Sequence, residues 1–361
     1  MPWRTGMISD AARVLSVGTA VPPYMVDQEH AKAFAREMFS QGGRRNVERL
    51  LRVFDHTGIE GRYLCVPFEW ARAEHTFPQK NDLYMEHAVD LSAKAARRAL
   101  DKIGADPDDV GALIFASNTG TSSPTVPHKL ISLMGLSPHV RVIPIYGRGC
   151  AGGAVALPLA ADQVRLQPGR LALVVAVELA SFTYQRSDLS KANLISSALF
   201  ADGAAAVLLG AADGVDTGPR VVGSHSTTWP ETEDIMGWEY METGMKVQLS
   251  RNLTDFLRER LPETLDHACA SIGVEPAQID HFLAHPGGPK VLDAIEEMFD
   301  LEPGSLQLSR GILRDYGNMS SAAVLFILQR YLEQGDYKAE DLALITALGP
   351  GFSCEHVFLS C

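Results

Sequence analysis

The sequence predicts an α/β protein that is built from two related βα halves. Three pairs of segments repeat in the same order along the chain. The pairs are ALIFASNTG (112–120) and HFLAHPGG (281–288), GCAGGAVALPLA from Gly149 and GNMSSAAVLFIL from Gly317, and LALVVAV (171–177) and LALITAL (342–348). The offset is nearly constant, 168 residues from Cys150 to Asn318 and 171 from Leu171 to Leu342. A duplication with a pseudo-twofold axis between the halves is the simplest explanation.

The rest of the chain alternates between helix and strand patterns. Residues 88–104 predict an amphipathic helix with an exposed basic face, and 198–210 predict a turn followed by a buried strand. Pro158 falls inside the helix that starts near Gly149, where a proline costs about 3 kcal/mol unless the helix bends or ends early. We therefore expect a kink in that helix.

Turn-forming residues gather at 211–220, which predicts the boundary between the halves. We place residues 1–215 in an N-terminal half that carries Cys150, and residues 216–361 in a C-terminal half. If the halves pack symmetrically, Cys150 and Asn318 occupy equivalent helix starts that face each other. They then share a crevice outside the carboxyl ends of the strands, where α/β proteins tend to bind ligands.

Composition excludes several classes of protein. The net charge of −12 argues against binding to nucleic acid or anionic membranes. The five cysteines form no CxxC pair, so neither structural zinc nor a disulfide scaffold is expected. The N-terminus lacks a basic start followed by an apolar stretch, and no apolar run approaches the roughly 20 residues of a membrane span. We expect a cytoplasmic protein without a membrane span or a metal.

Cys150 lies in IYGRGCAGGAVAL, where an apolar strand turns into a helix. A sulfur at a helix start faces unpaired N–H groups and the positive end of the helix dipole, which favour the thiolate. His285, in AHPGGPK, is the histidine at a strand end next to glycines, and an imidazole can ionise a cysteine by forming an ion pair with it. Asn318 follows a glycine at a helix start, where asparagine caps well. These three residues are our candidate catalytic set.

The order Cys, His, Asn also occurs in papain-like proteases, but the aromatic-flanked cysteine of that family has no counterpart in GRGCAGG. Five segments together instead resemble type III polyketide synthases, the chalcone synthase-like branch of the thiolase fold. They are IYGRGCAGGA, LFADGAAAVLLG, AHPGGPKVLDAI, YGNMSSAAVL and ALGPGFSCEHVFL. The resemblance implies a thiolase-like α-β-α-β-α arrangement and a homodimer. ETGMKVQLSRNL, VELASFTYQ and HPGGPK are most similar to bacterial alkylpyrone and alkylresorcinol synthases.

The resemblance also implies a reaction. Cys150 attacks an acyl-CoA starter and holds it as a thioester, and decarboxylation of malonyl-CoA supplies the carbanion that extends it. N–H donors of His285 and Asn318 stabilise the charge on the thioester oxygen, a contribution of about 2.7–4 kcal/mol per donor. No metal or organic cofactor is implied, because the CoA thioesters are substrates. A fatty acyl starter and an alkylpyrone or alkylresorcinol product are expected.

CoA requires local positive charge in this acidic chain. Arg45, Arg49, Arg52 and His56 recur on one helical face, and the resemblance assigns Arg49, Arg52 and His56 to the CoA phosphates. It assigns Gly287 and Lys290 to the pantetheine arm. Thr183 and Val247 stand near family positions that are often phenylalanine, so smaller side chains there predict room for a long starter. Neighbouring bulky residues such as Phe182, Tyr184 or Trp238 could refill that space.

Two other functions remain open at this stage. One is a condensing enzyme like ketoacyl-carrier-protein synthase III, or an acyltransferase on the same fold. The other is an inactive scaffold of that fold, against which the intact Cys150, His285 and Asn318 set argues.

Overall fold

The computed structural model describes residues 12–40, 47–211, 218–250 and 252–361. The first half contains β1 (Arg13–Ala20), β2 (Tyr24–Asp27), α2 (Gln28–Ser40), α3 (Val47–Asp55), β3 (Gly61–Leu64), α4 (Phe68–Ala71), α5 (Phe77–Ile103), β4 (Val110–Ala116), α6 (Val126–Met134), β5 (Arg141–Ile145), α7 (Gly152–Leu166), β6 (Leu171–Leu179), α8 (Lys191–Leu199) and β7 (Asp202–Gly210). The second contains β8 (Arg220–Thr228), β9 (Met236–Met241), β10 (Gly244–Leu249), α9 (Leu253–Ile272), β11 (His281–Ala284), α10 (Pro289–Met298), α11 (Gln307–Tyr316), α12 (Ala323–Gln334), β12 (Leu342–Gly349) and β13 (Ser353–Ser360).

The strand order confirms the duplication. The main sheet runs β11-β12-β13-β8-β1-β7-β6-β4-β5. Counted outward from the middle of the sheet, the strands on one side are β8, β13, β12 and β11. They correspond in this order to β1, β7, β6 and β4 on the other side. The pairings also correspond, because the first two contacts on each side are antiparallel and the third is parallel. Within the described residues, one pair, Arg13 and Arg220, joins β1 to β8, so two sheets meet at a single bridge.

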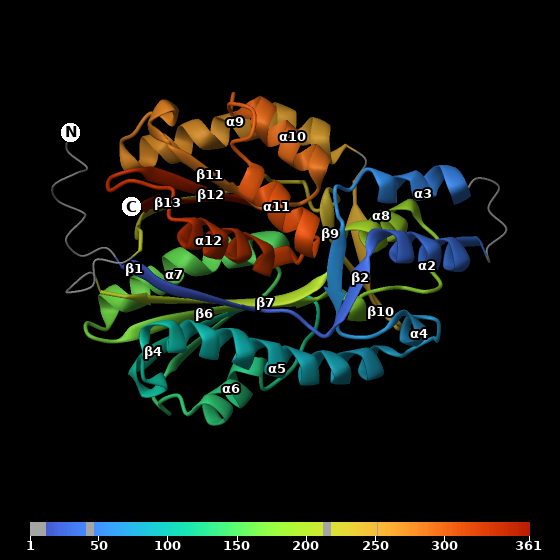
Figure 1. Cartoon of the computed structure of the whole chain (residues 1–361), viewed down its shortest axis with the longest axis horizontal. Helices are drawn as coiled ribbons and strands as arrows, with labels where there is room; N and C mark the ends of the chain where they lie inside the picture. Colours follow the sequence, from blue (N-terminus) through green and yellow to red (C-terminus); the bar gives the residue numbers. More distant parts are fainter. Residues whose placement is uncertain (1–11, 41–46, 212–217, 251) are drawn as a thin grey trace.

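Five layers stack across the molecule (Figure 1). From the top of that view they are α9 and α10, the strands β11 to β13, the central helices α12 and α7, the strands β6 and β7, and α5 with α6. The central strands are buried along their full length, as expected for strands covered on both faces. This is the thiolase-like α-β-α-β-α arrangement that the sequence predicts.

Most predicted elements are confirmed, with differences at their ends. The predicted helix 88–104 belongs to α5, which begins at Phe77 because Thr76 caps it with Gln79 in a capping box. The predicted strand within 198–210 is β7. Pro158 does not end the helix after Cys150, and α7 runs on to Leu166. Residues 212–217, including the boundary that we place at 215/216, lie outside the described residues.

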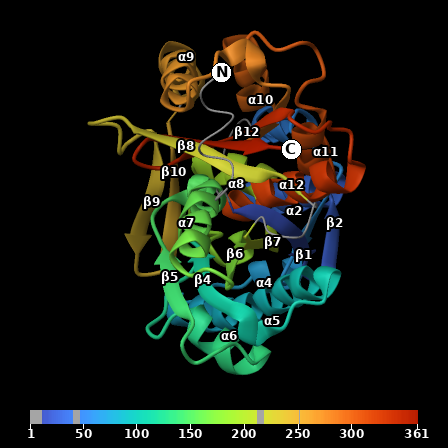
Figure 2. The ribbon, with the colours of Figure 1, turned by 90° about the vertical axis from the view of Figure 1, so that its left-hand side faces the viewer.

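At one end of the molecule, α2, α3, α4, α8 and the β9–β10 hairpin gather beside the layered body (Figure 1). The hairpin pairs from Gly244–Met241 to Leu249–Met236. Turned by 90°, the same hairpin stands along one side of the molecule (Figure 2). This end holds the cavities described below.

Candidate active site

Cys150 lies on a tight turn between β5 and α7. A 3₁₀ turn, Gly149–Ala151, leads directly into α7, and Cys150 is 8% exposed. Gly149 has a φ of 45°, and a Cβ there would lie 2.6 Å from Pro350, so only glycine fits this backbone. The Gly149 N–H donates to Asn118 Oδ1 at 3.0 Å. The predicted position of the sulfur at a helix start is therefore what the structure shows.

Ser320 brings the second half of the chain to Cys150. Its hydroxyl hydrogen-bonds the Cys150 sulfur, and both residues line one cavity. Ser320 has a φ of 47°, in the left-handed region that non-glycine residues seldom adopt. Such backbone strain is common where a protein must aim a particular side chain. The sequence comparison singled out Asn318 and missed Ser320, two residues further on.

Asn318 connects the remaining parts of the site. Its Oδ1 accepts the Ser320 N–H at 2.8 Å, and its Nδ2 donates to the Gly287 carbonyl at 3.3 Å. Its backbone pairs with Phe200 in a parallel bridge. The predicted role of Asn318 as a helix cap is wrong, because Met319 is the N-cap of the 3₁₀ turn and Ala322 that of α12; the bond from the Ser320 N–H instead closes an Asx turn.

His285 follows β11 directly, as Ser117 follows β4 in the other half. Its backbone N–H donates to the Thr346 carbonyl at 2.8 Å, which continues the β11–β12 pairing. The ring is buried, with His285 4% exposed, and neither Nδ1 nor Nε2 has a hydrogen-bond partner among the described residues. Buried polar groups are normally paired. Two unpaired ring nitrogens therefore indicate a group that awaits a ligand.

Burial changes the expected charge state of this site. It raises the pKa of the Cys150 thiol to about 12, which the Ser320 hydrogen bond opposes and the charge of Glu178 reinforces. It also lowers the pKa of His285 to about 3. Desolvation of the thiolate therefore outweighs the favourable effect of the helix start that the sequence predicts. An ionised sulfur at this buried position requires a compensating positive charge.

Glu178 is a fully buried carboxyl that lines the same cavity as Cys150. It accepts hydrogen bonds from the Asn118 N–H at 3.0 Å, Asn118 Nδ2 at 2.8 Å and the Ser321 hydroxyl at 2.6 Å. Burial raises its pKa despite these bonds. Sequence analysis overlooked it, although a lone acidic residue at the end of the apolar strand LALVVAVEL is a recognisable signal.

Arg148, immediately before the Cys150 turn, forms an ion pair with Glu355 of β13. Glu355 is buried and also accepts the Ser226 hydroxyl. Because the ion pair spans the two halves, it ties the nucleophile turn to the C-terminal sheet. Removing one partner of such a buried pair would leave an uncompensated charge.

Two adjoining cavities lie in front of the sulfur. The one that includes Cys150 has a volume of about 480 Å³ and its neighbour about 790 Å³, both counted with the solvent-filled space at their openings. Both are lined by Ala180, Phe200, Trp238 and Val247. The cavities therefore meet at these four residues. In the described part of the chain, neither His285 nor Asn318 lines either cavity.

The larger cavity is mainly apolar. Thr183 lines it, and Val247 lines both cavities, so both predicted pocket residues lie where a bound chain would pass. Phe200 and Trp238 also stand at the junction and narrow it. The sequence analysis named Trp238 only as a possible filler and did not consider Phe200.

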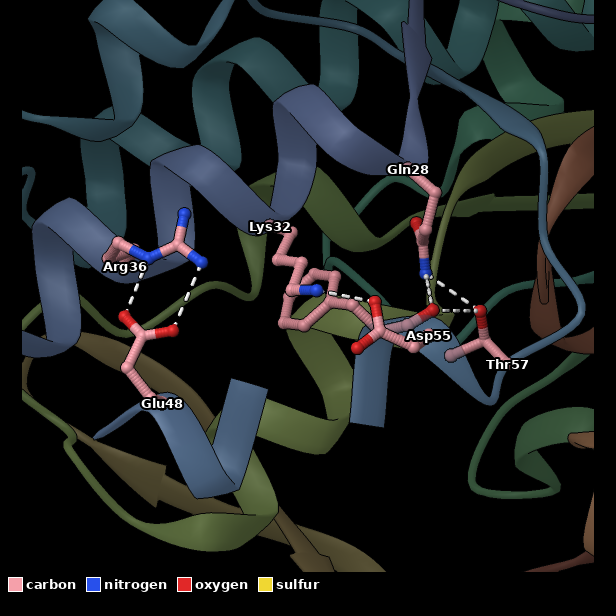
Figure 3. A network of polar contacts seen from close by, with 7 residues as sticks. Gln28, Lys32, Arg36, Glu48, Asp55 and Thr57 are labelled. Carbon is pink, nitrogen blue, oxygen red and sulfur yellow. Dashed lines mark hydrogen bonds and ion pairs between the residues drawn. The ribbon is translucent and has the colours of Figure 1, made fainter. Parts of the chain in front are cut away.

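The predicted CoA residues on α3 are exposed. Arg49 and Arg52 lie on the helix and His56 just beyond it, while Arg45 is outside the described residues. Figure 3 shows the ion pairs between α3 and its neighbour α2. Glu48 of α3 forms an ion pair with Arg36 of α2 at 2.7 Å, and Asp55 of α3 forms one with Lys32 of α2. Arg49 and Arg52 form no ion pair with a described residue.

The second predicted CoA segment is the loop after His285. Gly287 donates its N–H to the His285 carbonyl at 2.9 Å, and Lys290 is exposed at the start of α10. A Cβ at the neighbouring Gly288 would contact Leu199, the last residue of α8. Since α8 also packs against α3 through Leu194 and Ala198, both basic segments flank one helix.

Among the described residues, no group of three or more His, Cys, Asp or Glu side chains is placed to hold a metal ion. A search of the same residues finds no helix with the length and apolarity needed to cross a membrane.

Comparisons with known proteins cover the whole fold. The family model for the N-terminal domain of chalcone and stilbene synthases matches residues 4–213, and that for the C-terminal domain matches 220–361. A Bacillus subtilis (strain 168) protein named "Putative chalcone synthase" is 36% identical over 97% of this chain and 98% of its own. The 1,3,6,8-tetrahydroxynaphthalene synthase of Streptomyces peucetius subsp. caesius is 33% identical over 99% of this chain and 96% of its own.

Comparison with solved structures leads to the same family. The tetrahydroxynaphthalene synthase of Streptomyces coelicolor A3(2), a bacterial type III polyketide synthase, superposes with a TM-score of 0.91 at 29% identity, covering 96% of this chain and 99% of that one. The type III polyketide synthase domain of Steely1 from Dictyostelium gives a TM-score of 0.89 at 26% identity, over 97% and 99%. The chain therefore belongs to the chalcone and stilbene synthase family and is a type III polyketide synthase, a condensing enzyme.

Proposed function

We propose that this enzyme loads a medium- or long-chain fatty acyl-CoA on Cys150, extends it with malonyl-CoA, and cyclises the product to an alkylpyrone or alkylresorcinol. The observation that supports a long starter is the large apolar cavity that adjoins the Cys150 cavity. An acyl chain on the sulfur can extend past Phe200 and Val247 into it. Burial of each methylene there contributes about 0.8 kcal/mol.

Loading needs a proton transfer before the sulfur can attack. The Cys150 thiol gives its proton to His285 as the acyl-CoA binds, and the thiolate attacks the thioester carbonyl carbon. The bond from that carbon to the CoA sulfur breaks, and the departing CoA thiolate takes the proton from the imidazolium. His285 is then neutral again, which is the state that burial favours.

Extension begins when malonyl-CoA loses CO₂ and leaves an acetyl-CoA enolate. We assign the stabilisation of the enolate oxygen to N–H groups of neutral His285 and of Asn318, whose Nδ2 is held only by a 3.3 Å contact to Gly287. The enolate carbon attacks the acyl carbonyl carbon, and the bond to the Cys150 sulfur breaks. The lengthened chain leaves on CoA and can return to Cys150 for another round.

We assign CoA binding to Arg49, Arg52 and His56 for the phosphates and to Gly287 and Lys290 for the pantetheine arm. The exposure of the two arginines and their freedom from α2 support this assignment. The reaction as proposed uses no organic cofactor. A homodimer and a cytoplasmic location remain predictions, and light scattering of the purified enzyme tests the first.

A second candidate starter is malonyl-CoA itself. Relatives at 30% identity or more are named as tetrahydroxynaphthalene synthases, and ten carbons of such a product can come from malonyl units alone. The large cavity would then hold the growing intermediate rather than a preformed tail. Both candidates use the same Cys150 chemistry and differ only in what is loaded first.

Incubation of the purified enzyme with malonyl-CoA and a panel of acyl-CoAs separates these functions. We expect C8 to C16 starters to be turned over faster than acetyl- or malonyl-CoA, with products identified by mass spectrometry. Faster turnover of malonyl-CoA alone would contradict the fatty acyl starter and support the naphthalene product. A requirement for a carrier protein would instead indicate a ketosynthase III-like enzyme.

A further inference from the structure

Two stacked aromatic rings line the large cavity away from Cys150. Phe34 of α2 and Phe68 of α4 both line it, with ring centroids 4.4 Å apart and planes at 4°. No residue of α2 or α4 lines the Cys150 cavity, whereas Phe200 and Val247 line both. A chain that enters from Cys150 therefore reaches the Phe34–Phe68 pair only after it has passed Phe200 and Val247.

The outer side of this pair faces solvent through one further side chain. The Arg72 guanidinium lies 5.9 Å from the centroid of the Phe34 ring, and its side chain is 45% exposed. It forms ion pairs with Glu37 at 2.9 Å and with Glu69 at 3.1 Å. Phe34 thus contacts the Phe68 ring, which stacks on it, and also lies next to an exposed cation. The aromatic pair therefore lies between the cavity and the solvent-exposed Arg72 side chain.

The lining of α2 and α4 beside the pair is mostly small. Ala31 and Ala35 of α2 and Ala71 of α4 line the cavity with small side chains, and Phe39 of α2 is the further bulky residue there. The Arg72–Glu37 ion pair joins α4 to α2, so it restrains the helices that carry the rings. A chain long enough to reach the pair would meet restrained aromatic rings.

We propose that the Phe34–Phe68 pair is the end wall that limits the length of the acyl starter. The proposal rests on the fatty acyl starter proposed above and names the residues that set its upper length. Chains shorter than the cavity gain affinity with each methylene, while the first chain that reaches the rings collides with them. Hydrophobic pockets discriminate by about tenfold or more when one methylene no longer fits.

The test is the dependence of kcat/KM on starter length in the wild type and two opposed variants. For the wild type we expect kcat/KM to rise about fourfold with each added methylene. Beyond the longest chain that fits, kcat/KM should fall sharply, and this chain length is the break. Phe34→Ala should move the break to longer chains, with a gain on the order of tenfold for the first chain that the wild type rejects. Ala35→Leu adds volume inside the cavity and should move the break to shorter chains.

Controls separate this proposal from the general function and from misfolding. Leu133→Ala, on the exposed face of α6, should leave the break unchanged. If Phe34→Ala unfolds at a clearly lower temperature, Phe68→Leu provides the milder enlargement. A wild type that loads no fatty acyl group on Cys150, by mass spectrometry of the intact enzyme, contradicts the proposed starter. If the wild type loads such groups but the break falls at the same chain length in the wild type and in the variants, the proposed end wall is wrong and the fatty acyl starter still stands.

Discussion

Cys150 and His285 are each too deeply buried to carry a charge alone. Burial raises the pKa of the Cys150 thiol and lowers that of the His285 imidazole, so it disfavours the charged form of both groups. In the reaction proposed above the two charges compensate each other, and the unprotonated nitrogen of the neutral His285 ring, which has no hydrogen-bond partner among the described residues, accepts the proton. Under that proposal the reactivity of the sulfur depends on the histidine and not on the helix start alone.

Replacing His285 by Gln tests this dependence. The variant keeps an N–H donor but loses the base, so alkylation of Cys150 by iodoacetamide near pH 7 should slow on the order of 100-fold. The rate is measured by peptide mass spectrometry, and Cys150→Ala identifies the labelled peptide. Malonyl-CoA decarboxylation should fall less, since the donor remains. Equal alkylation rates in wild type and His285→Gln would show that the sulfur does not need the histidine.

Sequence reasoning predicted the local setting of the candidate catalytic residues better than their surroundings. Cys150, His285 and Asn318 follow strands or precede helices, and local patterns plus the repeat identify such positions. Ser320 and Phe200 gain their roles from packing between segments far apart in the chain. The charge state of Cys150 depends on burial, which a helix-start argument does not include.

The β9–β10 hairpin is the element that covers the junction of the two cavities. It contributes Trp238 and Val247 to both cavities. Its turn is held by Lys80 of α5, whose Nζ donates to the Tyr184 carbonyl at 2.9 Å and the Thr243 carbonyl at 3.0 Å. The shape of the two cavities therefore depends on a buried lysine of α5.

Lys80 also predicts a pH dependence of stability. Burial lowers its pKa from 10.5 to about 8, so between these values the unfolded chain holds a proton that the folded chain has lost. Stability then rises with pH across this window, and below pH 8 the full cost of burying the ammonium remains. Lys80→Met lacks this group, so its free energy of unfolding should rise less than that of the wild type from pH 8 to 10.

Urea unfolding at several pH values measures the difference. Lys94→Met, on the exposed face of the same helix, should follow the wild-type profile. Parallel profiles for wild type and Lys80→Met would contradict the assignment of this pH dependence to Lys80.

Elements were predicted well where the pattern is long and local. The repeated strands and the amphipathic part of α5 were found, because periodicity reveals both. The first turns of α5 were missed, since their start depends on the Thr76–Gln79 capping box rather than on an apolar stripe. The role of the hairpin could not be predicted, because it arises from contacts of Lys80 and Gln185 with its turn.

At the scale of the whole molecule, the two halves meet closely between the central helices. A Cβ at Gly153, in the first turn of α7, would lie 2.1 Å from the carbonyl oxygen of Ser321. Ser321 belongs to the 3₁₀ turn that also holds Ser320 against Cys150. The repeat in the sequence predicted two facing helix starts, and glycine at this point lets the backbones approach closely enough to build one site from both.

Gly153→Ala should therefore damage stability and loading together. Alanine favours a helix over glycine by up to about 1 kcal/mol, so a purely local effect would stabilise α7. The clash is with backbone, which has no rotamer to relieve it, and overpacking of this kind costs about 1–3 kcal/mol. Gly152→Ala is the matched control, because the neighbours of its Cβ are side chains, those of Ala116 and Ser321 at 3.3 Å and of Asn118 at 3.8 Å. We expect urea unfolding to show a lower free energy of unfolding for Gly153→Ala and a much smaller change for Gly152→Ala.

Acyl loading of Cys150 should also fall in Gly153→Ala, because separation of the two turns moves Ser320 away from the sulfur. Equal behaviour of the two variants would mean that the halves do not depend on this contact.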